Sequence, residues 1–183
     1  MLVMPGFLAK TLRRTTPMIK MIEDFATEYT REAQGTQRVM DALTDASLAQ
    51  KITPELRSLG QIAWHIATTV HEMLSRTGLT FAAPEGEEIA PASAQTIADT
   101  YRTSAAAAID AIQTQWTDAK LFETSDMYGD QWPNGLTLRV LISHEIHHRG
   151  EMIVLMRQAG LRVPDIYGPT RESWVEMGMQ PLV

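Results

Sequence analysis

The 183-residue chain contains no cysteine. This absence excludes disulfide bonds, thiolate nucleophiles and thiolate metal ligands together. Any metal site in the chain must therefore take its ligands from His, Asp and Glu side chains.

Basic residues and long apolar segments are also scarce. Lys and Arg number 16 against 22 Asp and Glu, a net charge of −6, whereas nucleic-acid binding draws most of its affinity from clustered basic residues. No apolar run approaches the roughly 20 residues that a membrane span requires. The stretch from Leu2 to Ala9 is short even for a secretory signal. We therefore expect a cytoplasmic protein that binds neither nucleic acid nor a membrane.

What the chain does contain is helical periodicity in four long stretches, within a length typical of one domain. Apolar residues recur near a 3.6-residue spacing, and a shorter helical segment follows near the C-terminus. Turn residues between 121 and 135 predict a short hairpin or loop. We expect an all-α four-helix bundle over residues 18–178 with a short extra C-terminal helix, preceded by an N-terminal extension at residues 1–17. The expected helices cover residues 18–43, 53–77, 93–117, 136–158 and 171–177.

The start of the second helix is predicted from Thr53-Pro54-Glu55. These residues supply a cap, a proline at an early helical position and an acidic residue for the positive end of the helix dipole. We expect the helix to begin there, with Leu56 on its buried side, and to end before Gly78.

All five histidines fall in two places, His65 and His71 in the second predicted helix and His144, His147 and His148 in the fourth. Four residues separate His144 from His148, so the two rings lie about 40° apart on adjacent turns and can aim at one point. Both interrupt an apolar stripe, which places them toward the core. The same spacing occurs on solvated faces and among hydrogen-bonded core histidines, so the pair alone does not establish a metal site.

A third ligand has to come from another helix, and His65 lies beside Ile62 and Ile66 on the inward side of the second. His71 is rotated by about 240° from His65, so the two cannot share one site. A lone histidine on an apolar face is more often a satisfied core residue, so His65 gains weight only in combination. His147 lies about 60° from His144, and we expect it to flank the site.

Two segments, Gly60–Ile66 (GQIAWHI) and His144–Glu151 (HEIHHRGE), resemble the DinB/YfiT-like family, and the resemblance extends over residues 20 to 175. In that family a histidine of the second helix joins two histidines of an H-x-x-x-H-R-G-Q element around Zn²⁺ or Ni²⁺. The resemblance therefore implies a metal held by His65, His144 and His148, a four-helix bundle fold and a homodimer. Glu151 stands where the family pattern has Gln, which adds a negative charge one turn beyond His148.

Three protein ligands leave a coordination position open, as catalytic metal sites do. A thiol or water at that position loses its proton more readily than in bulk solvent. Some members of the family transfer low-molecular-weight thiols such as bacillithiol or mycothiol, and many have no assigned reaction. We expect a metal-dependent thiol transferase or hydrolase acting on a small molecule, and the histidines do not distinguish these reactions. The alternative is a noncatalytic, metal-binding or stress-associated interaction protein.

Three further residues are candidates for a catalytic role. Glu72 lies two helical turns from His65, about 10.5 Å along the axis, and could act as a general base or remain a solvated carboxylate at the helix end. Arg149 could steer an anionic substrate or pair with an acid at the surface. His147 is the third candidate, as a residue that faces the substrate.

Overall fold

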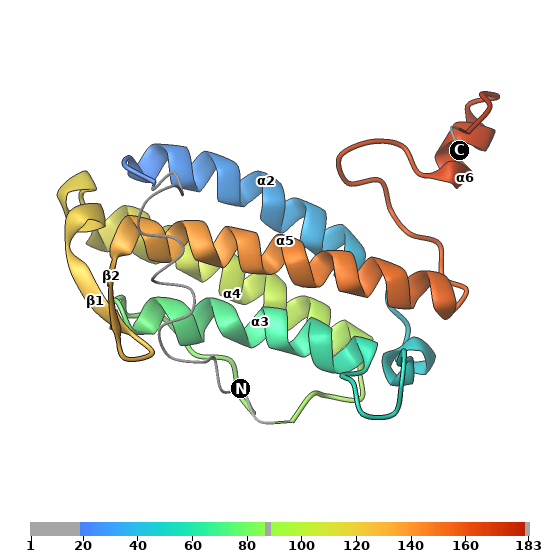
Figure 1. The fold of residues 1–183 in the computed structure, drawn as a ribbon, viewed down its shortest axis with the longest axis horizontal. Coiled ribbons are helices and arrows are strands. Elements are labelled where there is room, and N and C mark those ends of the chain that lie inside the picture. The colour runs from blue at the N-terminus through green and yellow to red at the C-terminus, as the bar shows by residue number, and fades with distance from the viewer. Residues whose placement is uncertain (1–18, 87–88, 182–183) are drawn as a thin grey trace.

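The computed structural model describes residues 19–86 and 89–181, so the extension expected at residues 1–17 lies outside the described part of the chain. Four long helices, α2, α3, α4 and α5, pack as a bundle (Figure 1). Within it, α2 and α3 each pack against both α4 and α5. The expected all-α bundle is confirmed. The helices are α2 (Ile22–Asp41), α3 (Leu59–Ser75), α4 (Ala94–Gln115) and α5 (Asn134–Gln158).

The directions of the helices decide which residues can meet. Figure 1 shows α3 and α4 running the same way, whereas α5 runs opposite to α3. A 3₁₀ helix, η1 (Asp45–Ala49), links α2 to α3. An antiparallel arrangement places the middle of α3 beside the middle of α5, where two of the histidine-bearing turns lie.

The segment before α5 forms the hairpin that its turn residues predict. It consists of η2 (Asp118–Phe122), β1 (Thr124–Met127) and β2 (Asp130–Pro133), with Thr124 paired to Pro133 and Met127 to Asp130. Tyr128 and Gly129 form the two-residue turn with φ angles of 61° and 89°, the left-handed geometry that closes such hairpins. After α5 the chain continues to α6 (Arg171–Glu176), the predicted short helix.

The start of the second helix was predicted wrongly, because α3 begins at Leu59 rather than at Thr53. Ser58 and Gln61 form a capping box in which each side chain accepts a hydrogen bond from the other residue's backbone N–H, so two otherwise unpaired donors are satisfied. Residues 51–57 form a loop instead, and Leu56 is 52% exposed rather than buried. A proline and an acidic residue alone do not offer an equivalent cap.

No helix in the described part of the chain combines the length and apolar character needed to cross a membrane. The apolar faces of the four long helices meet in one core inside the bundle. Phe25 and Tyr29 of α2 stack there with ring centroids 5.1 Å apart. Core residues from the other helices include Ile66, Ile97, Ile112, Leu138 and Met152.

The N-terminus of α5 is held by close packing at Asn134 and Gly135. Asn134 is fully buried; its backbone N–H donates to the Glu123 carbonyl, and its side-chain amide donates to the Lys120 carbonyl. A Cβ atom at residue 135 would lie 2.2 Å from the carbonyl oxygen of Ile19. Only glycine therefore allows the chain before α2 to lie against the start of α5.

We expect Gly135→Ala to lower the free energy of unfolding by about 1–3 kcal/mol, the usual cost of overpacking a filled site. Gly150→Ala is the matched control in the same helix, since Gly150 is exposed and its added Cβ would meet nothing within 4 Å. That substitution should raise stability by about 0.5–1 kcal/mol. Urea denaturation followed by circular dichroism measures both, and equal stability of the two variants would contradict the expectation.

Candidate metal centre

Three histidines converge where α3 faces α5. Nε2 of His65 lies 3.1 Å from Nε2 of His144. The ring of His148 has its centroid 4.9 Å from that of His65 and 4.4 Å from that of His144. Each residue offers one ring nitrogen, and these nitrogens all lie within 4.8 Å of one another. The structure thus brings together the three ligands that the sequence predicts, in a group that could bind a metal ion.

The donor set fits a tetrahedral divalent ion. Zinc–nitrogen bonds of about 2.0–2.1 Å place neighbouring nitrogens of a tetrahedral site about 3.3 Å apart, close to the 3.1 Å between the Nε2 atoms of His65 and His144. Two neutral imidazoles at this distance can also share one hydrogen bond, the ordinary alternative for a buried pair. A hydrogen-bonded pair of histidines would not require a third ring, so the presence of His148 favours a metal site.

Partners on the other ring nitrogens orient two of the three rings. Nδ1 of His65 lies 3.2 Å from the Thr69 hydroxyl, and Nδ1 of His148 lies 2.6 Å from Oε2 of Glu151. Such outer contacts leave Nε2 of both rings available to a metal, and a carboxylate partner also raises the basicity of the ring. Glu151, the residue that departs from the family pattern, therefore contacts the site directly although it is 44% exposed.

Burial lowers the pKa of two of the three rings, those of His65 and His144. Burial, followed by the nearby His144 and Arg57, lowers the pKa of His65 to about 3. Burial, followed by His148 and His147, lowers the pKa of His144 to about 4. Both rings are consequently neutral at neutral pH, the protonation state that a metal ligand needs.

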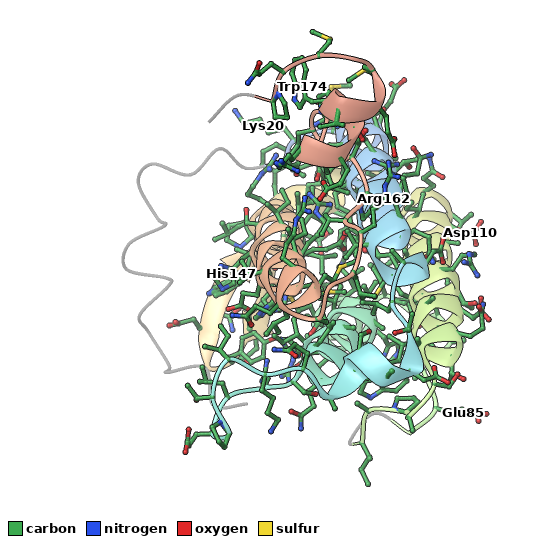
Figure 2. All side chains as sticks on the ribbon, turned by 90° about the vertical axis from the view of Figure 1, so that its right-hand side faces the viewer. Lys20, Glu85, Asp110, His147, Arg162 and Trp174 are labelled. Atoms are coloured by element: carbon green, nitrogen blue, oxygen red, sulfur yellow. The ribbon has the colours of Figure 1, made fainter. Side chains whose placement is uncertain are left out.

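The other two histidines are not among these three rings, although His147 lies beside His148 and forms with it and Glu151 a second, more exposed group that could hold an ion. His147 is 67% exposed and lies 3.4 Å from Oε1 of Glu151, and Figure 2 shows it on the outer side of α5. It flanks the site, as its angular position on the helix predicts. His71 packs its ring edge-on against Phe81 with centroids 5.0 Å apart, in agreement with its expected separation from His65.

Glu72 is engaged at the hairpin. Its carboxylate accepts a hydrogen bond of 2.6 Å from the Tyr128 hydroxyl and pairs with Arg76 at 2.7 Å. Arg76 also lies over the Tyr128 ring, 4.6 Å from its centroid. These contacts attach the hairpin to the end of α3. Glu72 is thus a hydrogen-bonded carboxylate near the end of α3 that remains 37% exposed, and its role as a general base stays a prediction.

Arg149 was predicted to steer a substrate or to form a surface ion pair, and both interpretations are wrong. Its side chain is 2% exposed and pairs at 2.7 Å with Glu32 of α2, which is 3% exposed. Arg149 directly follows His148, the last histidine of the cluster, in the chain, but its side chain lies on the side of α5 that α2 covers. Glu145 is also buried on this side, where it accepts hydrogen bonds of 2.7 Å from Thr36 and Tyr101.

Two hollows open beside the histidines. The larger, of about 850 Å³, reaches His65 between α3, η1 and residues 89–92. The smaller, of about 440 Å³, reaches His148 and Glu151, and its other walls are mainly apolar. Arg57 lines both hollows. The sequence did not single out Arg57 because the predicted helix start made it an ordinary helical arginine. Thr69 was not singled out either, although its i+4 spacing from His65 allows the hydrogen bond.

Known proteins with similar sequences and structures share this architecture. The model of the DinB family matches residues 18–180. The uncharacterized protein YrdA of Bacillus subtilis (strain 168) is 46% identical over 163 residues, which cover 89% of this chain and 98% of YrdA.

Among solved structures, a DinB-like protein from Bacillus cereus ATCC 10987 superposes with a TM-score of 0.79 at 47% identity, covering 82% of this chain and all of that one. The DinB-like protein YjoA of Bacillus subtilis shares the fold, with a TM-score of 0.62 at 16% identity over 78% of this chain and 97% of its own. The family match, the close relative and the helical bundle agree: this chain belongs to the DinB family.

Proposed function

We propose that this protein is a metal-dependent enzyme that activates a small thiol and joins it, through its sulfur, to an electrophile. The observation that carries the proposal is the convergence of His65, His144 and His148 from two helices. The described residues place only these three in the group, and three protein ligands leave a position for a substrate. Imidazole ligands accept several divalent ions, and we propose Zn²⁺ or Ni²⁺.

A divalent ion bound here would supply a Lewis acid that lowers the pKa of a thiol or water sharing its open position. The chain's own residues perform the remaining tasks. Thr69 and Glu151 hold the rings of His65 and His148. The hollows open to solvent, so the proton lost by the thiol passes to water. Low-molecular-weight thiols stay reduced in the cytoplasm, which supports the cytoplasmic location we propose.

The two hollows favour thiol transfer over hydrolysis. Ligand pockets of about 300–1,000 Å³ are common, and both hollows fall in this range, at about 850 Å³ and 440 Å³. A transfer reaction brings two organic substrates together, whereas hydrolysis needs room for one substrate and a water molecule. One hollow reaches His65 and the other reaches His148, so two substrates can approach the same centre from different sides.

Metal binding is the first test. Protein purified without a histidine tag should carry close to one transition-metal ion per chain by elemental analysis, and His148→Ala should abolish binding. Glu151→Gln should weaken affinity by about tenfold, because the ligand loses its charged partner. Glu85→Gln, an equal charge change at an exposed loop residue, should bind like the wild type. Wild-type protein that neither contains nor takes up metal on titration would contradict the proposal.

The reaction itself is tested with the metal-loaded protein, several small thiols and 1-chloro-2,4-dinitrobenzene. We expect the wild type to accelerate formation of the thioether, and His144→Ala to fall to the uncatalysed rate because a ligand is lost. His71→Ala, which alters a histidine outside the cluster, should keep its activity. Equal rates for wild type and His144→Ala would remove thiol transfer at this centre and favour the noncatalytic alternative.

We also propose that the chain forms a homodimer, as the family resemblance implies. Support comes from α6, which buries none of its residues and stands away from the bundle in Figure 1. Val175 is 53% exposed there, and Met177 and Met179 just beyond it are 54% and 50% exposed. Light scattering after gel filtration should give twice the chain mass, and Val175→Asp should lower it. A monomer at every concentration would contradict the dimer.

A further inference from the structure

The larger hollow combines access to the metal centre with a local excess of positive charge. The hollow is lined by α3 residues that include Trp64, His65 and Thr68. Lys51, Arg57 and Asp45 also line it. The N-terminus of α3 at Ser58 also lines the hollow, and helix N-termini carry partial positive charge. This balance is unusual in a chain whose net charge is −6.

Arg57 is the cation in this hollow that is left available. The Lys51 ammonium donates to the Pro54 carbonyl at 3.2 Å. Asp45 accepts the backbone N–H of Ala94 at 2.7 Å, at the start of α4, so its carboxylate is engaged there. No hydrogen bond or ion pair joins Arg57 to any other residue in the described part of the chain. Its guanidinium is therefore free to bind a ligand.

Arg57 also occupies the position between the two hollows. Among the described residues it alone lines both, and the hollows reach His65 on one side and His148 on the other. Its charge contributes to the lowered pKa of both His65 and His144, which agrees with a position close to the centre. A group held by Arg57 would therefore lie beside the open coordination position.

We infer that Arg57 binds the anionic group of the thiol substrate, so that the enzyme selects thiols that carry a carboxylate. A guanidinium donates two parallel hydrogen bonds to a carboxylate, which fixes the orientation of the bound molecule. The larger hollow holds the body of this thiol, and its sulfur reaches the three histidines. The inference rests on the proposed function and names the class of its first substrate.

The step balances without any further reactant. The thiol gives its proton to water, and the sulfur then uses an electron pair to form a bond to the electrophilic carbon. With 1-chloro-2,4-dinitrobenzene the carbon–chlorine bond breaks and chloride leaves with its electron pair. Arg57 takes no part in these bond changes, because it contacts the carboxylate and leaves the sulfur free.

The test uses cobalt(II)-loaded protein, in which sulfur binding produces a charge-transfer absorption band independent of turnover. Affinities of 3-mercaptopropionate and of neutral 2-mercaptoethanol are measured for the wild type and for Arg57→Gln. We expect the preference for 3-mercaptopropionate to fall about tenfold in Arg57→Gln, the lower end of what a hydrogen bond to a charged group contributes. Arg57→Lys should retain part of it, since the point charge remains.

Arg162→Gln is the matched control, because it removes the same charge from a residue that follows the end of α5, is 58% exposed and pairs with Glu176. Its preference should equal that of the wild type. An unchanged preference in Arg57→Gln, with cobalt bound normally, would overturn the role of Arg57 while leaving the metal centre intact. Failure of the wild type to bind cobalt would instead contradict the proposed function.

Discussion

The buried polar contacts of α5 with α2 and α4 are the constraint on which the three-histidine cluster depends. Arg149 pairs with Glu32, and Glu145 accepts hydrogen bonds from Thr36 and Tyr101, all within the bundle. Removing one partner of a buried ion pair lowers the free energy of unfolding by about 3–5 kcal/mol, because the remaining charge is left buried without a partner. A shift of α5 by one turn, about 5.4 Å, would break every one of these bonds. They therefore fix the turn of α5 that presents histidines to α3.

The position of α3 is fixed by different contacts at its two ends. At the start, the capping box of Ser58 ends the loop, and Gly60 lies so close to η1 that an added Cβ would be 3.0 Å from Leu48. At the other end, Glu72 holds the hairpin through Tyr128. His65 lies between these attachments. The candidate metal centre thus lies between two helices whose registers are set independently, so three rings converge without a residue from a loop.

Much of this arrangement follows from local patterns. Helical periodicity predicted the long helices, and the helix expected from residue 93 is α4, which Ser93 caps. The i, i+4 spacing predicted that His144 and His148 would act together. The errors arose where two local signals competed or where burial decided the outcome. The predicted start at Thr53-Pro54-Glu55 lies five residues before Ser58, the residue that caps α3, and it placed Arg57 inside a helix. Arg149 was assigned to the surface because charged residues usually lie there.

The sequence by itself determined the donor chemistry, since a chain without cysteine and with its histidines on two helices can bind a transition metal only through imidazole and carboxylate groups. It also determined which two rings share one helix face, because 3.6 residues per turn act within a single segment. Only the tertiary structure decided that His65 meets this pair, that Arg149 is buried and that Arg57 lies beside the centre. Those relations join segments far apart in the chain, and packing of the whole bundle, rather than local spacing, sets their distances.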